Sequence, residues 1–156
     1  MGEVAQLTKK DIKQVDGCWC IDINENDQGK SLKNRHSARL VPLVDGAFGF
    51  DLSAFLEAVQ AGALPSDNGI NAMNASRYLG TLIKKALGED RLETQSLHSL
   101  RHSMASRLQS KGTPLPFTQA ILGHASGSIS YDGYGSSVPV KALAEVLSGV
   151  YGTGDR

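Results

Sequence analysis

The segment HSLRHSMASRL at residues 98–108 constrains the fold more than any other part of the sequence. It is composed of helix-forming residues, and His98, Arg101 and His102 stand at positions i, i+3 and i+4, so they share one face of that helix. A soluble helix rarely gives so much of one face to cationic and titrating groups without a partner. The segment therefore predicts a helix that presents this face to an anion.

The remaining patterns predict an α+β fold that is mainly α, with one small antiparallel β-hairpin, in a single domain over residues 1–156. Residues 3–12 read as a short helix with Val4 and Leu7 facing inward. Strands are predicted over 18–23 and 38–43, joined by a long polar tip. Further helices are predicted over 51–65 with Ser53 as N-cap, and over 70–88, 96–112, 115–124 and 138–151.

Composition narrows the function classes only partly. The formal net charge is zero, which argues weakly against a nucleic-acid binder, but a neutral total can conceal a basic face. No apolar run is long enough to span a bilayer and no secretion signal opens the chain, so we expect a cytoplasmic protein with no membrane partner. Cys18 and Cys20 point to the same side of a strand, which disfavours a mutual disulfide, and a four-ligand zinc site lacks further cysteines.

Cationic groups gather on three separate segments, and phosphate is the anion whose shape suits an arginine fork combined with point charges. Each group alone has an ordinary explanation, as a solvated lysine, a core or capping histidine, or an arginine paired with a carboxylate. It is the spacing across segments that favours an anion site. The set comprises Lys30, Lys33 and Arg35 on the hairpin tip, His98, Arg101 and His102 on a helix, and His124 at a helix end, followed by Tyr131 and Tyr134 in a Gly- and Ser-rich loop over 125–137.

Two other chemistries compete with phosphate binding. His98 and His102 have the spacing of two zinc ligands, but Ser99 follows the first histidine where a catalytic carboxylate would stand, and Arg101 would repel a divalent cation. A nucleophilic serine lacks the G-x-S-x-G elbow, and the Gly-rich segment lacks the form of a nucleotide cradle. We therefore expect neither a metal nor a cofactor.

The motifs together resemble the catalytic domain of tyrosine recombinases, the phage integrase family. HSLRH at 98–102 resembles the family's H-x-x-R-H helix, LGH at 122–124 its L-G-H corner, and Tyr134-Gly135 stands ten residues past His124, near the nucleophile's place. SLKNRHSARLVPL at 31–43 resembles the strand in which a lysine precedes R-x-V-P-L, and EVAQLTKKDI at 3–12 resembles E-x-x-x-L-x-x-x-D-I. The resemblance thus covers nearly the whole chain.

The resemblance implies a role for each matching residue on double-stranded DNA. Tyr134 would attack a phosphodiester and form a 3′-phosphotyrosyl bond, and Arg101 would hold the non-bridging oxygens. His98 would act in proton transfer or bind the same phosphate, His124 would donate a hydrogen bond to it, and Lys33 would protonate the leaving oxygen. His102 would support the helix. Lys30 remains an alternative to Lys33, and Tyr131 to Tyr134. The spacing to Pro42 favours Lys33, and the distance from His124 favours Tyr134.

One departure from the family pattern concerns an arginine that the family places three residues before the glutamate matching Glu3, ahead of Met1. That arginine and the N-terminal DNA-binding domain are absent from the given sequence, so we expect an integrase catalytic-domain fragment that is inactive or nearly so alone. The full-length protein would act as a homo-tetramer on DNA. The segment 138–151 could either dock on a neighbouring protomer or pack on its own domain. The alternatives are a non-catalytic DNA-binding or regulatory remnant of an integrase, and an unrelated helical domain.

Overall fold

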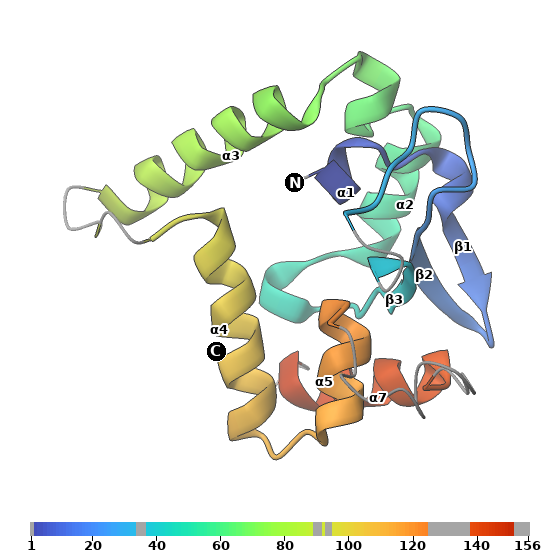
Figure 1. The fold of residues 1–156 in the computed structure, drawn as a ribbon, viewed down its shortest axis with the longest axis vertical. Helices are drawn as coiled ribbons and strands as arrows, with labels where there is room; N and C mark the ends of the chain where they lie inside the picture. Colours follow the sequence, from blue (N-terminus) through green and yellow to red (C-terminus); the bar gives the residue numbers. More distant parts are fainter. Residues whose placement is uncertain (1, 34–36, 89–91, 93–94, 125–137, 152–156) are drawn as a thin grey trace.

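A computed structural model describes residues 2–33, 37–88, 92, 95–124 and 138–151. The protein is mostly helical with a small three-stranded antiparallel sheet, which confirms the predicted α+β class (Figure 1). The five longer helices agree with the predicted ranges to within a few residues at most ends. They are α2 (Leu52–Gln60), α3 (Ala72–Leu87), α4 (Leu97–Ser110), α5 (Leu115–Leu122) and α7 (Val140–Tyr151).

The sheet has the order β1-β2-β3, from Ile12–Val15, Cys18–Ile23 and Arg39–Pro42. The two predicted strands are confirmed as β2 and β3, with Cys20 opposite Pro42. β1 is an additional strand that pairs with β2 through a two-residue turn, Asp16-Gly17. Both turn residues have positive φ, 51° and 78°, which is the geometry of a tight type I′ hairpin.

The helix predicted over residues 3–12 is wrong in its extent. Only α1 (Gly2–Ala5) and a 3-10 turn (Lys9–Asp11) are helical, and Ile12 already starts β1. Thr8 and Asp11 divert the backbone, because the Asp11 carboxylate accepts hydrogen bonds from the Thr8 N–H at 2.7 Å and from its hydroxyl at 2.9 Å. Leu7 is buried as predicted, but Val4 is 45% exposed.

Two apolar clusters form the interior. One lies between the sheet and α2, where the buried residues are Ile12, Val59 and Leu64. The second joins α4, α5 and α7, with Leu108, Ile121, Leu143, Leu147 and Val150 buried. The buried face of α7 thus packs against α4 and α5 of the same chain. The N-cap of α2 is Asp51, which accepts from the Ala54 N–H at 2.9 Å, and Ser53 is not the cap that we predicted.

Helix α4 carries the polar segment 98–108, and its neighbours are α3 and α5. In Figure 1, α3 extends away from the sheet, and α4 runs back from its far end towards α5. Of the α3 residues only Ala75 is buried, and large apolar side chains such as Met73 and Tyr78 are 65% and 66% exposed. No helix in the described part of the chain is long and apolar enough to cross a membrane.

A candidate anion site at the end of α5

The C-terminal end of α5 brings together two of the predicted residues, Arg101 and His124, with Arg39. The last carbonyls of a helix have no partner within it and need donors from elsewhere. Here two arginines from distant elements supply them: Arg39 of β3 donates from Nε to the Ile121 carbonyl at 3.2 Å, and Arg101 of α4 donates from Nη2 to the Leu122 carbonyl. These bonds bring β3 and α4 to one point.

Gly123 ends α5 and lies directly against one of these arginines. Its φ of 67° is in the left-handed region that favours glycine at a helix C-terminus. A Cβ placed there would lie 2.6 Å from Nη1 of Arg39, closer than side chains approach one another. The glycine of the LGH motif is thus required both for the turn of the backbone and for the approach of Arg39.

His124 follows immediately, and its backbone N–H donates to the Gln119 carbonyl at 3.0 Å. His124 is exposed as a residue. Partial desolvation of its imidazole by neighbouring atoms, and then the positive charges of Arg101 and Arg39, lower the pKa of His124 below its usual range. The ring is therefore predominantly neutral near pH 7, and a neutral imidazole can donate one hydrogen bond. We call Arg39, Arg101, Gly123 and His124 the α5 corner.

The α5 corner carries more positive than negative charge. Arg39 pairs with Glu3 of α1, with 3.0 Å between Nη2 and Oε2. Among the described residues, no carboxylate lies within salt-bridge distance of Arg101. Only one of the two guanidinium groups thus has a carboxylate partner, and this leaves the corner able to accept an anion.

The other predicted residues on α4 lie on its exposed surface. His98 is exposed one turn before Arg101, and its ring meets that of His102 edge to face, with 4.7 Å between the centroids. No contact in the described part of the chain joins His98 to His124. The structure therefore brings Arg101 and His124 together and places His98 on the same helix, one turn away.

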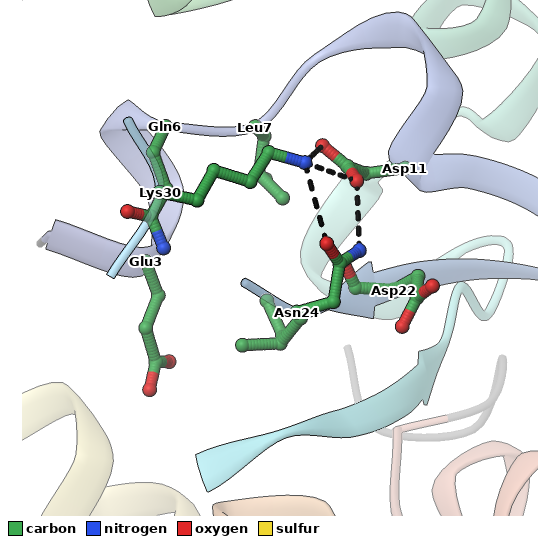
Figure 2. Close-up of a pocket in the computed structure, with 8 residues that line it drawn as sticks. Glu3, Gln6, Leu7, Asp11, Asp22, Asn24 and Lys30 are labelled. Carbon is green, nitrogen blue, oxygen red and sulfur yellow. Dashed lines mark hydrogen bonds and ion pairs between the residues drawn. The ribbon is translucent and has the colours of Figure 1, made fainter. Parts of the chain in front are cut away.

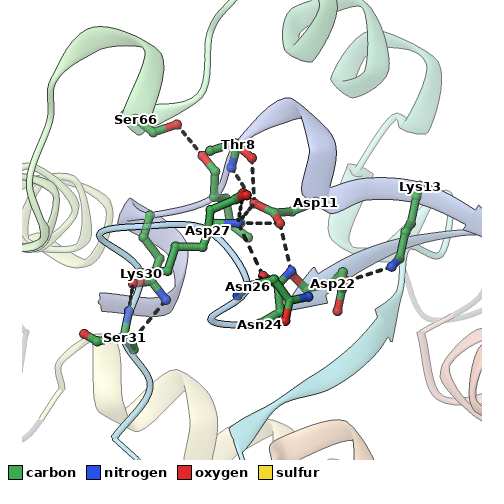
Figure 3. Close-up of polar contacts among 12 residues, drawn as sticks. Thr8, Asp11, Lys13, Asp22, Asn24, Asn26, Asp27, Lys30, Ser31 and Ser66 are labelled. Carbon is green, nitrogen blue, oxygen red and sulfur yellow. Dashed lines mark hydrogen bonds and ion pairs between the residues drawn. The ribbon is translucent and has the colours of Figure 1, made fainter.

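Of the two candidate lysines, Lys30 is occupied in a buried network (Figures 2 and 3). Its ammonium lies 2.6 and 2.7 Å from the two oxygens of Asp11 and 3.2 Å from Asp27. The side chains of Lys30 and Asp11 are only 6% and 4% exposed. Lys33, in contrast, is exposed. The geometry favours Lys33 as the lysine that can reach a ligand.

The charge state of the Lys30 network follows from competing effects. Burial alone would raise the pKa of Asp11, but hydrogen bonds from Lys30, Thr8 and Asn24 together lower it below its usual range. Burial alone would lower the pKa of Lys30, but hydrogen bonds and charge from Asp11 and Asp27 raise it. Both groups therefore remain ionised across the physiological pH range.

The N-terminal segment also holds the chain next to Lys30. The Gln6 side chain accepts from the Ser31 N–H at 3.0 Å and donates to the Ser31 carbonyl at 3.1 Å. These two hydrogen bonds and the Lys30–Asp11 pair fix the start of the segment that carries Lys33. The segment's other end is held at Ser37, whose carbonyl accepts from Nη1 of Arg39 at 2.7 Å.

Tyr134, Tyr131 and Arg35 lie outside the described residues, so their predicted roles are not tested by the structure. Among the described residues there is no group of three or more His, Cys, Asp or Glu side chains that could hold a metal ion. Sequence reasoning missed Arg39, Glu3 and Asp11 as parts of the site and its support. The R-x-V-P-L run was the available signal for Arg39, since it marked that arginine as part of a pattern.

Comparison with known proteins agrees with the motifs. The model of the phage integrase family matches residues 1–137. A protein of Caldanaerobacter subterraneus subsp. tengcongensis named "Tyrosine recombinase XerC-like" is 31% identical over 87 residues, which cover 56% of this chain and 22% of the relative. The matched part is thus well under two thirds of that relative's length, and no solved structure matches the chain. Since the family model spans most of the sequence, the chain belongs to the phage integrase family.

Proposed function

We propose that this chain is the catalytic part of a site-specific DNA recombinase, which cleaves and rejoins double-stranded DNA through a 3′-phosphotyrosyl intermediate. The observation that carries the proposal is the charge of the α5 corner. Two guanidinium groups and an imidazole meet there beside a single carboxylate. A DNA phosphodiester supplies the negative charge that this arrangement lacks.

In the proposed reaction the hydroxyl oxygen of Tyr134 attacks phosphorus, and the bond from phosphorus to the 5′ oxygen breaks. The DNA 3′ end is then esterified to the tyrosine, and Lys33 delivers a proton to the departing 5′ oxygen. His98 takes part in transferring the tyrosine proton. Attack by a 5′-hydroxyl on the phosphotyrosine reverses these steps, so the bond energy is retained and rejoining needs no external energy source.

Arg101 and His124 would act on the non-bridging oxygens. Charge builds on these oxygens in the transition state, and donors fixed in advance stabilise it without reorganising. The bond from Arg101 to the Leu122 carbonyl orients the guanidinium, and the low pKa of His124 keeps its ring a neutral donor near pH 7. We infer that the corner binds the transition state more strongly than the resting phosphodiester.

We further infer that the recombinase acts as a homo-tetramer on DNA, at the nucleoid of the cytoplasm.

The experiment is a covalent trap with a nicked DNA duplex, in which the departing 5′ fragment diffuses away after cleavage. Long incubation with the polypeptide should produce a protein–DNA adduct that survives denaturing detergent. Tyr134→Phe should abolish the adduct, and Tyr131→Phe, as the matched control, should retain it. If no adduct forms although the DNA is bound, or if Tyr134→Phe still forms it, the chain is a binding remnant or uses another nucleophile, and the proposal fails.

A further inference from the structure

Arg39 is the most fully engaged cation of the α5 corner. An arginine has five N–H donors, and here Nε bonds the Ile121 carbonyl while Nη1 serves the Ser37 carbonyl and the Glu3 carboxylate. Nη2 donates to the other oxygen of Glu3 at 3.0 Å, which makes the pairing with Glu3 two-pronged. The side chain is only 14% exposed.

These commitments distinguish Arg39 from Arg101. Arg39 has four of its five donors occupied by protein groups, whereas the described contacts of Arg101 are limited to one carbonyl. A guanidinium whose donors already bond protein groups cannot also bind a phosphate through two parallel hydrogen bonds. Its partners instead come from α1, from the segment before β3, and from the end of α5. It thus joins three parts between which the described residues form no backbone hydrogen bond.

We propose that Arg39 is a positioning residue that locks the Gly123–His124 turn against α1 through Glu3, so that Arg101 and His124 present fixed donors to one phosphate. The proposal rests on the proposed function for the identity of the ligand, a DNA phosphodiester. The order of the α5 corner itself is measurable without DNA. The Arg39 guanidinium also holds the turn through direct contact, because it lies against the position that a Cβ of residue Gly123 would occupy.

The first test uses Arg39→Lys, which keeps the positive charge but loses the planar fork. Nuclear magnetic resonance titration of the histidine ring protons reports the pKa of His124, whose charged neighbours are Arg101 on α4, Arg39 on β3 and, through Arg39, Glu3 on α1. Release of the turn would let the ring move away from the neighbouring atoms and the guanidinium charges that lower its pKa, so the pKa should rise towards the ordinary value of about 6.5. If Arg39 contributed only charge, the pKa would stay where it is.

Arg107→Lys is the matched control. Arg107 also donates from Nε to a helix carbonyl, that of Val150 at 3.2 Å, but it lies near the other end of α4 and stacks over Tyr151. This variant should leave the pKa of His124 unchanged. An equal shift in both variants, or no shift in Arg39→Lys, would overturn the proposal.

The second test uses Glu3→Gln and a short DNA duplex at constant salt. Removing a negative charge beside the site would tighten DNA binding if Arg39 acted only through its charge. Under the proposal, losing the carboxylate releases the fork, and binding should weaken about tenfold. Tighter or unchanged binding would contradict the proposal. If the wild-type chain binds no DNA at all, the proposed function fails, while the His124 titration still decides the role of Arg39.

Discussion

The Lys30 network and the α5 corner are both built on cations, but they treat charge in opposite ways. Lys30 lies between Asp11 and Asp27 and is almost fully buried, so its charge is matched within the protein (Figure 3). Arg101 has a helix carbonyl as its described partner and no carboxylate within reach among the described residues. The comparison teaches that a cation matched by carboxylates supports the fold, whereas an unmatched cation is available to an external anion.

The largest expected effect comes from breaking the matched pair. Asp11→Asn would leave Lys30 buried with only Asp27, whose side chain is 44% exposed, as a counter-charge. Removing one partner of a buried ion pair typically costs about 3–5 kcal/mol of the free energy of unfolding. Urea denaturation followed by circular dichroism measures this cost.

The matched control for Asp11→Asn is Asp22→Asn. Asp22 pairs with Lys13 at a similar distance, 2.7 Å, but Lys13 is 45% exposed, and exposed pairs contribute about 0–1 kcal/mol. Equal losses in the two variants would show that burial of the Lys30 network has no special weight, and would remove one side of the comparison.

An intermediate effect is expected from Gly123→Ala. A left-handed backbone costs a residue with a Cβ about 1–2 kcal/mol, and here the methyl group would also displace the Arg39 guanidinium. Gly112→Ala is the control, since Gly112 has a similar φ of 71° but open space around it. Urea denaturation should show a larger loss for Gly123→Ala, and only that variant should weaken DNA binding. Equal losses of stability in the two variants would mean that the Arg39 side chain moves aside without an energetic cost.

The smallest expected effects are those of pH on the free energy of unfolding. The Lys30 network and the α5 corner should respond in different pH ranges. Because the pKa of Asp11 is lowered, its contribution to the free energy of unfolding is present at pH values above its ordinary pKa of about 3.9. That contribution is lost as the pH falls through the folded-state pKa. The lowered pKa of His124 likewise predicts that stability declines as the pH falls below about 6.5, because the unfolded state takes up the proton first. Denaturation across a pH series should show the second decline in the wild type and not in His124→Asn.

The helices were predictable because residues close in sequence mark their ends. Asn71 caps α3, Gly88 follows its last residue, and Gly123 closes α5 in the left-handed conformation. β1 was not predicted, although Asp16-Gly17 is a strong hairpin signal, because the strand has only four residues, Ile12–Val15, and the first of them fell in the helix predicted over 3–12. The spacing of Thr8 and Asp11, whose hydrogen bonds cap the start of the 3-10 turn, was a local signal as well.

The site was predictable only in part, because its decisive contacts are distant in sequence. Arg101 and His124 were found from their motifs. Arg39 was not, since its carbonyl partner Ile121 lies 82 residues away. Spacing favoured Lys33 over Lys30 but did not exclude Lys30, whose partner Asp11 is 19 residues away. Local patterns identify which residues carry charge, and only the fold determines which charges are matched.

The most direct test of the central claim is the affinity of the polypeptide for a short DNA duplex, measured by fluorescence anisotropy at one fixed salt concentration. Arg101→Ala removes the unmatched cation, and loss of charge-assisted hydrogen bonds should weaken binding about 10–100-fold. Arg107→Ala, which removes an equal charge from the other end of α4, should change it little. Equal weakening by the two variants, or none by Arg101→Ala, would contradict the claim that the α5 corner is the phosphate site.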